Sequence, residues 1–420
     1  MVIGYGSNKI ALSESKARSI MAKALATLPV DGKKVLILIP DRTRTAPMPL
    51  FFKLFYELLG DRVAKLDYLV ALGTHSPLDE AGMTALVGVG EAERKAKYPK
   101  VTLHNHRWDL PDTFKRIGVI TKAETNQITG GLLSADVPVE LNKLIFDYDQ
   151  LIICGPTFPH EVVGFSGGYK YLFPGIAGPD IINFFHWLGA LLTSTKIIGH
   201  KVTPVRDVLN IAAEFITVPT YCFSFAMKGN KMMGLFAGHP KETYDKAADL
   251  SAELNVIYVD KPFKKVLSMA AEMYDDIWTA AKAMYKLEPA VEDGGELIIY
   301  APHVTEISYT HGKVLDQVGY HCIDFFLKQW DKYCGFPGGV LAHSTHVKGS
   351  GTYENGMEKP RIHVSLATNI PEERVRKINL GYVDPKTINV AEWEGREDEG
   401  IVVIHHAGEM LYRLSSEKGK

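Results

Sequence analysis

Short apolar runs alternate with amphipathic stretches along the first half of the chain. Residues 34–40 form a continuous apolar run typical of a buried strand, and residues 49–59 carry apolar side chains at helical spacing. Further apolar runs occupy 66–72 and 149–154, with a helical stretch at 78–87. Because short apolar strands separated by helices are typical of α/β proteins, this half predicts a doubly wound, largely parallel sheet.

The pattern changes near residue 265. Before it, two more strands are predicted at 215–219 and 255–259; after it, a helical pattern runs from 266 to 290. A turn at 293–295 follows, and the later strands are predicted at 296–300, 361–367 and 400–405. We therefore expect two domains, with residues 1–265 forming the N-terminal α/β domain and residues 266–420 a smaller C-terminal α/β domain.

Composition narrows the class of protein. The 420 residues are 46% hydrophobic and 23% charged, which excludes a disordered chain. The net charge of -2 gives no excess of positive charge with which to bind nucleic acid or anionic membranes. The apolar stretch at 181–192 is too short to span a bilayer. The first residues lack the long apolar core of a signal peptide, so we expect a cytoplasmic protein.

The cysteines suggest neither a zinc ribbon nor a disulfide scaffold. Four of them occur in 420 residues, and no two form a C-x-x-C pair. They are Cys154, Cys222, Cys322 and Cys334.

Three polar motifs follow predicted strands. Asp41-Arg42-Thr43-Arg44 follows the run at 34–40, and Gly73-Thr74-His75 follows the run at 66–72. The strand at 149–154 leads to His160 and then to a glycine cluster that ends in Lys170. Ligands of parallel sheets bind beyond the carboxyl ends of the strands, so the convergence of three motifs indicates a site there.

Each motif alone has an ordinary structural reading. Asp41 could cap a helix, His75 could be a turn residue, and His186 could be a core histidine. The known signatures also fail: His160 does not begin an H-E-x-x-H motif, and Tyr169 separates the glycines from Lys170, so the cluster is no Walker loop. The glycine cluster and Lys170 still suit an anion.

Taken in order, these residues resemble the nickel-pincer lactate racemase family. The resemblance rests on Asp41 to Arg44, Gly73 to His75, His160 ten residues before Lys170, and His186 sixteen residues after it. Lys282 is similar to the lysine of the family's second domain. The family implies two α/β domains with the active site in the cleft between them.

The resemblance also implies a cofactor, the nickel pyridinium-3-thioamide-5-thiocarboxylate mononucleotide. Lys170 would attach it covalently and His186 would bind the nickel, while Asp41, Gly167 and Gly168 would hold the nucleotide. The cofactor itself would supply the other nickel donors, which agrees with the lack of a metal motif in the chain. Accessory enzymes make this cofactor, so they are implied partners.

The implied reaction is racemisation or epimerisation of a 2-hydroxy acid by hydride transfer to and from the cofactor. His75 and His160 would be the two bases, one for each enantiomer. Arg44 and Lys282 would bind the substrate carboxylate.

Two single residues depart from the family's pattern, and the second of them, Thr279, bears on binding of the substrate carboxylate. Tyr169 stands where a basic residue is frequent, and Thr279 stands where a glutamine is frequent. In the second domain, His343-Ser344-Thr345-His346 and the nearby Lys348 offer polar groups where lactate-using members should be apolar. His346 and Lys348 are therefore predicted to bind a larger acid, such as an aldonate or a dicarboxylic hydroxy acid.

Two alternatives stay open at this stage. One is a protein that binds or carries the pincer nucleotide without racemising a substrate, against which the intact His75 and His160 argue. The other is an NAD-dependent dehydrogenase or a hydrolase on a doubly wound sheet. The absence of G-x-G-x-x-G and G-x-S-x-G from the sequence argues against it. The oligomeric state and the particular acid are not fixed by the sequence.

Overall fold

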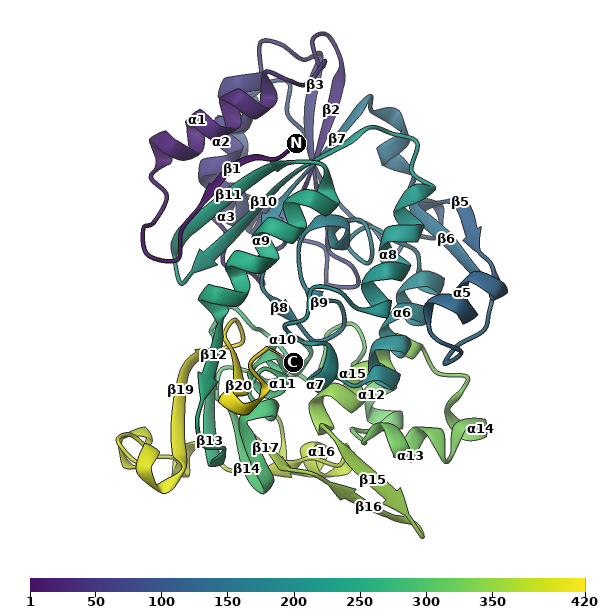
Figure 1. Cartoon of the computed structure of the whole chain (residues 1–420), viewed down its shortest axis with the longest axis vertical. Coiled ribbons are helices and arrows are strands. Elements are labelled where there is room, and N and C mark those ends of the chain that lie inside the picture. The colour runs from purple at the N-terminus through teal and green to yellow at the C-terminus, as the bar shows by residue number, and fades with distance from the viewer. Residues whose placement is uncertain (420) are drawn as a thin grey trace. The chain divides into compact units, whose positions relative to one another are not determined.

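The computed structural model describes residues 1–419, which divide into two compact units (Figure 1). Unit 1 comprises Met1–Phe158, Phe165–Ile182 and Arg206–Leu254. Unit 2 comprises Pro159–Gly164, Asn183–Val205 and the chain from Asn255 onward. The last passage between units thus lies near the predicted boundary, but two earlier segments belong to unit 2 although the sequence pattern places them in the N-terminal domain.

Unit 1 contains a seven-stranded sheet and its covering helices. Its strands are β1 (Ile3–Gly6), β2 (Lys34–Ile39), β3 (Lys65–Val70), β4 (Leu103–Asn105), β7 (Gln150–Pro156), β10 (Thr220–Lys228) and β11 (Lys231–Gly238), with a separate pair β5 (Phe114–Ile120) and β6 (Val137–Asn142). Its helices are α1 (Glu14–Leu25), α2 (Met48–Leu59), α3 (Glu80–Val87), α4 (Glu91–Lys97) and α5 (Lys122–Ile128). Four elements begin in one unit and end in the other: β9 (Gly164–Phe165), α6 (Pro179–Leu192), α8 (Pro204–Glu214) and α9 (Pro240–Asn255).

The strand order of this sheet is β1-β11-β10-β7-β2-β3-β4. The five strands from β10 to β4 are parallel, whereas β1 and β11 run antiparallel to their neighbours. This confirms the predicted doubly wound, largely parallel sheet. The chain order reverses between β2 and β7, and such a switch point is where sheets of this type bind ligands.

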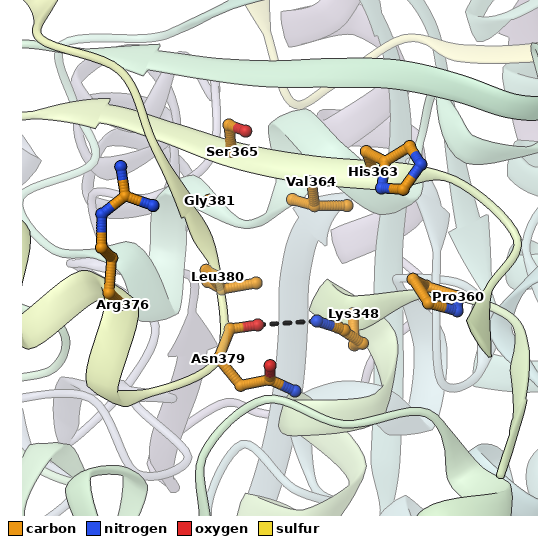
Figure 2. A pocket seen from close by; sticks show the side chains of 9 residues that line it. All are labelled: Lys348, Pro360, His363, Val364, Ser365, Arg376, Asn379, Leu380 and Gly381. Atoms are coloured by element: carbon orange, nitrogen blue, oxygen red, sulfur yellow. Dashed lines mark hydrogen bonds between the residues drawn. The ribbon is translucent and has the colours of Figure 1, made fainter. Parts of the chain in front are cut away.

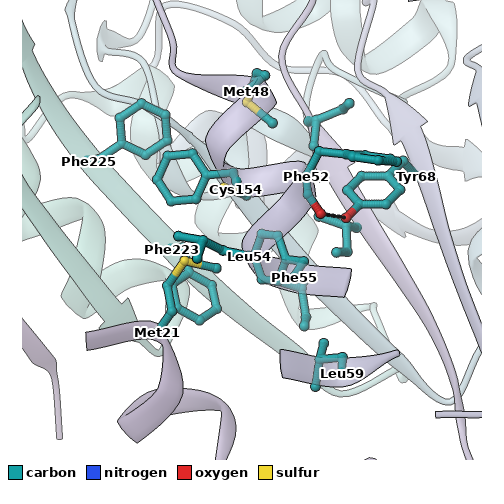
Figure 3. Close-up of a cluster of buried hydrophobic side chains, with 14 of the residues drawn as sticks. Met21, Met48, Phe52, Leu54, Phe55, Leu59, Tyr68, Cys154, Phe223 and Phe225 are labelled. Atoms are coloured by element: carbon teal, nitrogen blue, oxygen red, sulfur yellow. Dashed lines mark hydrogen bonds between the residues drawn. The ribbon is translucent and has the colours of Figure 1, made fainter. Parts of the chain in front are cut away.

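Both faces of β2 are buried, which explains its continuous apolar run. Val35, Ile37 and Ile39 pack in a cluster with side chains from α1, α2 and α3. Figure 3 shows part of this cluster, including Met21 of α1, Phe55 of α2 and Phe223 of β10. Within that cluster the rings of Phe51 and Phe225 stack with centroids 4.8 Å apart. Burial of one large apolar side chain contributes about 1.5–3 kcal/mol, so this cluster is a main source of the stability of unit 1.

Helix α9 covers β10 and β11 on the face of the sheet opposite to the cluster just described. Leu250 and Leu254 pack against Ala226 of β10 and Met233 of β11, whereas Phe225 belongs to the cluster on the other side. Alternation along a strand puts neighbouring residues on opposite faces. Helices therefore cover both faces of the sheet, as a doubly wound fold requires.

One strand predicted in this unit is wrong. Residues 215–219 lie between α8 and β10, and the strand itself begins at Thr220. Strand β10 is joined to β11 by a two-residue turn, Gly229-Asn230, in which Gly229 has φ +52°. Asn and Gly are the usual residues of such hairpin turns, so this signal was present in the sequence.

Unit 2 is built around a five-stranded parallel sheet of order β18-β17-β14-β13-β19. Its strands are β8 (Pro159–His160), β12 (Val256–Val259), β13 (Phe263–Ala270), β14 (Val291–Ala301), β15 (Gly351–Glu354), β16 (Met357–Pro360), β17 (His363–Thr368), β18 (Gly381–Tyr382), β19 (Ile401–Ala407) and β20 (Leu411–Leu414). Its helices are α7 (Ser194–Ile197), α10 (Ile277–Ala280), α11 (Lys282–Tyr285), α12 (Gly312–Val318), α13 (Ile323–Leu327), α14 (Trp330–Tyr333), α15 (Gly338–Lys348) and α16 (Glu372–Lys377).

The long helix predicted at 266–290 is wrong. Its first part is β13, which pairs with β14 on one side and β19 on the other. A strand buried on both sides is apolar at most positions, so helical spacing of Val266 and Met269 arises by chance. Only the short helices α10 and α11 follow.

The turn predicted at 293–295 lies within β14 and not before it, whereas the strand predicted at 296–300 is confirmed, because regular pairing with β13 and β17 begins at Glu296. Strand β14 continues through these residues, and its register with β13 shifts between Phe263 and Lys265. Gly294 has φ +80° there, so the two glycines form a bulge inside the strand. Among residues 1–419, no helix combines the length and apolar character needed to cross a bilayer.

Candidate active site

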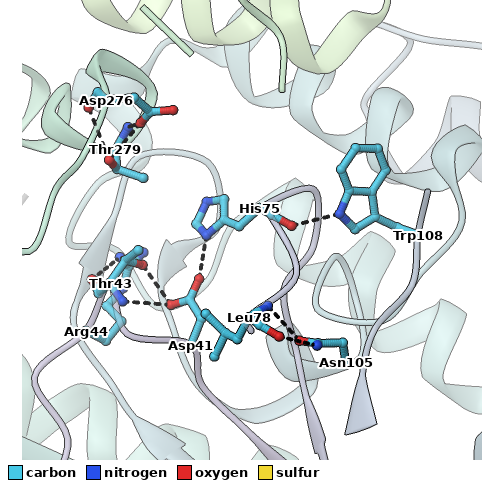
Figure 4. A network of polar contacts seen from close by, with 9 residues as sticks. All are labelled: Asp41, Thr43, Arg44, His75, Leu78, Asn105, Trp108, Asp276 and Thr279. Carbon is cyan, nitrogen blue, oxygen red and sulfur yellow. Dashed lines mark hydrogen bonds and ion pairs between the residues drawn. The ribbon is translucent and has the colours of Figure 1, made fainter. Parts of the chain in front are cut away.

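A carboxylate–imidazole pair lies at the switch point of unit 1. Asp41 follows β2, and its Oδ2 lies 2.5 Å from Nδ1 of His75, which follows β3 (Figure 4). The other carboxylate oxygen accepts the Thr43 backbone N–H at 3.0 Å and the Thr43 hydroxyl at 2.8 Å. Asp41 is therefore not a helix cap: α2 begins at Met48 after Pro47, with no side-chain cap.

The backbone around His75 is held on both sides. Gly73, at φ +60°, donates its N–H to Gly175 O at 2.9 Å, and the Trp108 indole donates to His75 O at 2.8 Å. Because the Asp41 carboxylate accepts at Nδ1, the neutral ring carries its proton there. The Nε2 lone pair is then the basic position of this imidazole.

Arg44 lies on the same loop as Asp41. Its guanidinium Nη1 donates to Thr43 O at 2.9 Å and to Thr43 Oγ1 at 3.3 Å. Burial raises the pKa of Tyr171 well above its usual value, and Arg44 and Asp41 also influence that pKa with opposite signs. The loop after β2 and the segment next to Lys170 are therefore neighbours within unit 1.

The glycine loop, residues 165–171, carries Lys170. Gly167 has φ +96° and Gly168 φ +56°, conformations that favour glycine. A Cβ on Gly167 would lie 2.4 Å from Thr157 Oγ1, so no larger residue fits there. Lys170 begins no regular helix, since it lies in a single 3-10 turn, Gly168–Tyr171, and its N–H donates to Gly167 O at 3.2 Å.

Three residues around the glycine loop were missed by the sequence analysis. Thr157 is fully buried, and its hydroxyl has no hydrogen-bond partner within the part of the chain that the structure describes. Arg206 of α8 donates to carbonyls of the loop, and its guanidinium lies 3.9 Å from the ring of Tyr244. No motif marks these residues, because they reach the loop from three separate elements.

His160 belongs to unit 2 and is 7% exposed. Its Nδ1 lies 3.2 Å from the Val162 N–H and 3.3 Å from Oε2 of Glu161. A carboxylate thus lies beside Nδ1, as it does at His75. This carboxylate neighbour is the feature that the two predicted bases share.

A group of imidazole, lysine and aromatic side chains gathers within unit 2. Burial lowers the pKa of His343 well below its usual value, and the nearby His346, His311, His186 and Lys282 lower it further. The Trp278 ring stacks on His343 with centroids 4.1 Å apart and lies tilted against His311 with centroids 4.3 Å apart. Unit 2 therefore brings together four residues that the sequence analysis selected: His186, Lys282, His343 and His346.

Lys282 and Thr279 have defined surroundings in this group. The Lys282 ammonium lies 4.5 Å from the centre of the Tyr274 ring, and the residue is 5% exposed. Asp276 caps α10 and accepts the Thr279 N–H at 2.9 Å and the Thr279 hydroxyl at 2.8 Å (Figure 4). The Thr279 hydroxyl is thus engaged within the chain.

His346 is buried on α15. Burial lowers its pKa to about 3, so the ring is neutral at physiological pH. Its Nε2 has no hydrogen-bond partner among the described residues, and it borders a small cavity with Thr193, Ser194 and Ser350.

Lys348 lies in another pocket, at the end of α15. Its ammonium donates to Asn379 O at 2.6 Å, beside His363 and Arg376 (Figure 2). The structure therefore does not bring Lys348 together with the group around His343.

No group of three or more His, Cys, Asp or Glu side chains in residues 1–419 is arranged to hold a metal ion.

Residues 7–197 match the sequence profile of the lactate racemase N-terminal domain. The chain is 25% identical to the lactate racemase of Thermoanaerobacterium thermosaccharolyticum over 309 residues, or 70% of this chain and 67% of the relative. It is 23% identical to the lactate racemase of Lactiplantibacillus plantarum over 305 residues, with the same coverage.

A solved structure extends this similarity to almost the whole chain. A Thermotoga maritima protein is 32% identical and matches with a TM-score of 0.90, covering 98% of this chain and 100% of its own. The chain belongs to the lactate racemase family. The lactate racemase apoprotein from T. thermosaccharolyticum shares the fold of this family member, with a TM-score of 0.69 at 20% identity, covering 96% of this chain and 93% of that one.

Proposed function

We propose that this chain is a racemase or epimerase that inverts C2 of a 2-hydroxy acid. Its strongest support in the structure is the Asp41–His75 pair at the switch point of unit 1. Membership of the lactate racemase family supports the same reaction class. The proposed cofactor is the nickel-pincer nucleotide, attached to Lys170.

The glycine loop fits a bound nucleotide. A buried hydroxyl without a partner, Thr157 Oγ1, lies against Gly167, where a Cβ has no room. A buried polar group is normally hydrogen-bonded, so this hydroxyl suits a ligand atom. Lys170, Asp41, Gly167 and Gly168 would hold the nucleotide, and His186 would bind the nickel. When bound, the cofactor supplies nickel and an acceptor for the C2 hydride.

His75 and His160 handle the hydroxyl proton in this proposal. The Asp41 carboxylate keeps the proton of neutral His75 on Nδ1, so Nε2 takes the proton from the substrate hydroxyl of one enantiomer. The resulting imidazolium is stabilised by the same carboxylate. Nδ1 of His160 accepts the Val162 N–H, and Glu161 Oε2 lies 3.3 Å from the same nitrogen, where it would stabilise the charged form of this ring in the reaction of the other enantiomer.

Arg44 and Lys282 bind the substrate carboxylate in this proposal. Guanidinium matches the planar carboxylate with two parallel hydrogen bonds, whereas the ammonium of Lys282 acts as a point charge. Arg44 donates from Nη1 to the Thr43 carbonyl, and a guanidinium carries further N–H donors with which it can bind a carboxylate.

The substrate is proposed to be larger or more polar than lactate, for example an aldonate or a dicarboxylic hydroxy acid. His343 and His346 are buried polar groups of unit 2, and Trp278 adds an aromatic face beside His343. A buried polar group left without a partner costs about 1–3 kcal/mol, which disfavours a methyl group at this position. Among the residues predicted to bind the distal end, the contacts support His346; Lys348 stays a prediction.

A panel of enantiopure 2-hydroxy acids tests the function. Protein from a host that makes the cofactor is incubated with lactate, malate, 2-hydroxyglutarate and several aldonates, and the products are separated by chiral chromatography. We expect C2 inversion of at least one acid, fastest for a polyhydroxy or dicarboxylic one. Faster inversion of lactate contradicts the polar substrate, and no inversion by protein with modified Lys170 contradicts the racemase.

A further inference from the structure

A buried arginine lies beneath the glycine loop. Arg206 is 3% exposed, and its guanidinium donates to two backbone carbonyls of the loop, Gly167 O at 3.2 Å and Phe165 O. The same group lies 3.9 Å from the ring of Tyr244 of α9. Arg206 therefore links α8, α9 and the glycine loop inside unit 1.

Burial of this cation is costly, which argues for a specific role. Loss of solvent lowers the pKa of Arg206, but a guanidinium remains charged in proteins. An apolar side chain of similar volume would fill the space without that desolvation, and such replacements are often neutral or stabilising. Arginine is distinguished here by a planar fork that binds two acceptors of one loop at once.

The two acceptors fix two peptide planes of a segment that contains two consecutive glycines. Glycine adopts positive and negative φ with similar ease, so Gly167 and Gly168 would populate several conformations without an external contact. A trans peptide carries its C=O and its N–H in opposite directions. When Arg206 binds Gly167 O, it therefore also sets the direction of the Gly168 N–H.

The Arg206 contact and the turn that contains Lys170 share one acceptor atom, Gly167 O. Gly167 O accepts both the Arg206 guanidinium and the Lys170 backbone N–H, each at 3.2 Å. A change in this carbonyl would alter both contacts together. A Cβ on Gly168 would lie 3.0 Å from Cβ of Tyr244, so Arg206 and its stacking partner both border the two glycines of the loop.

We propose that Arg206 is a positioning residue that holds the glycine loop in the conformation in which Lys170 is modified. This rests on the proposed attachment of the cofactor to Lys170. Arg206 acts through the loop backbone, so its loss lowers the fraction of chains that carry the cofactor. The order that it gives to the loop exists in the apoprotein and is measurable there.

Three variants separate this role from general stability. Arg206→Met removes the fork, and Arg206→Lys keeps a cation beside Tyr244 but not both hydrogen bonds. Arg62→Met is the matched control, because Arg62 also donates to two carbonyls of unit 1, Leu25 O and Leu28 O, away from the glycine loop. Melting temperatures measured on all three compare their stability.

Hydrogen exchange of apoprotein and peptide mass analysis of loaded protein give the two readouts. We expect Arg206→Met to speed exchange in residues 165–171 about tenfold or more, because hydrogen bonds from a charged donor are among the strongest. The adduct on Lys170 should fall several-fold, with Arg206→Lys between. Arg62→Met should change neither, even at an equal loss of melting temperature.

Different results overturn the two proposals. Wild-type exchange and wild-type adduct in Arg206→Met, or in Arg206→Lys if the first variant does not fold, overturn the positioning role. The same holds if Arg62→Met changes the loop as much as Arg206→Met. If wild-type protein from a cofactor-making host carries no adduct on Lys170, the proposed attachment fails. Exchange is then the only readout, and wild-type exchange of residues 165–171 in Arg206→Met overturns the positioning role of Arg206.

Discussion

At the scale of single residues, the sequence could indicate the side chains that follow strands, but not their partners. Asp41 and His75 were both selected, and the structure joins them at 2.5 Å. Thr157 and Arg206 were missed, because a buried hydroxyl and a helix arginine carry no sequence signal of the loop they contact. The sequence pattern therefore predicted the functional groups at the strand ends, whereas the residues that support them could be identified only from the three-dimensional structure.

His75→Ala should lower the rate of inversion in both directions by roughly 10²–10⁴-fold, the usual contribution of a general base. Both directions are affected because one imidazole removes the hydroxyl proton and the other returns it. Initial rates with each enantiomer measure this. His104→Ala is the control: His104 also lies near a carboxylate, 3.3 Å from Asp67, but on β4. Unchanged rates in His75→Ala remove His75 from the mechanism.

His186→Ala should abolish bound nickel and preserve the fold. Loss of one half-buried imidazole costs at most a few kcal/mol, because most single substitutions destabilise by about 0.5–3 kcal/mol. Metal analysis of purified loaded protein, together with a melting curve, measures both. His363→Ala, on an exposed position of unit 2, serves as the control. Full nickel retention in His186→Ala would refute its role as ligand.

At the scale of elements, prediction succeeded where a strand is central and its ends are marked. Strand β2 was placed within one residue, because both of its faces are apolar and Asp41 follows it. Strand β13 was mistaken for a helix, because full burial removes the alternation that distinguishes strands. The bulge in β14 was mistaken for a turn, since a Gly-Gly pair is common to both.

Helix α15 makes the stability of the protein depend on pH. The pKa of His346 is lowered to about 3 by burial, while an unfolded chain titrates near 6.5. Between these values only the unfolded state binds this proton, so acid favours unfolding. The neutral His346 therefore has no cost in stability above about pH 6.5. As the pH falls from 6.5 toward 3, the free energy of unfolding decreases.

His346→Gln should therefore reduce the pH dependence of the free energy of unfolding by up to about 1.4 kcal/mol per pH unit between pH 6.5 and 4. Urea unfolding of the apoprotein at several pH values measures this slope. His363→Gln, which changes an exposed histidine, should leave it unaltered. An equal slope in wild type and His346→Gln contradicts a neutral, buried His346.

At the scale of the whole molecule, each unit has its own parallel sheet with its own reversal of strand order. In unit 1 the reversal lies between β2 and β7, next to Asp41; in unit 2 it lies between β13 and β19. Sequence alternation predicted the first sheet, whereas the assignment of Pro159–Gly164 and Asn183–Val205 to unit 2 depends on long-range packing. The local sequence pattern does not indicate that these two segments pack with unit 2.

The central claim is that C2 is inverted by hydride transfer and that the histidines move only the hydroxyl proton. A proton held on imidazole exchanges with water, whereas a hydride passed between carbons does not. Inversion of an accepted acid is therefore run in D₂O with loaded protein and followed by mass spectrometry and ¹H NMR at C2. We expect inverted product that keeps its C2 hydrogen; one solvent deuterium at C2 per inversion would contradict the claim.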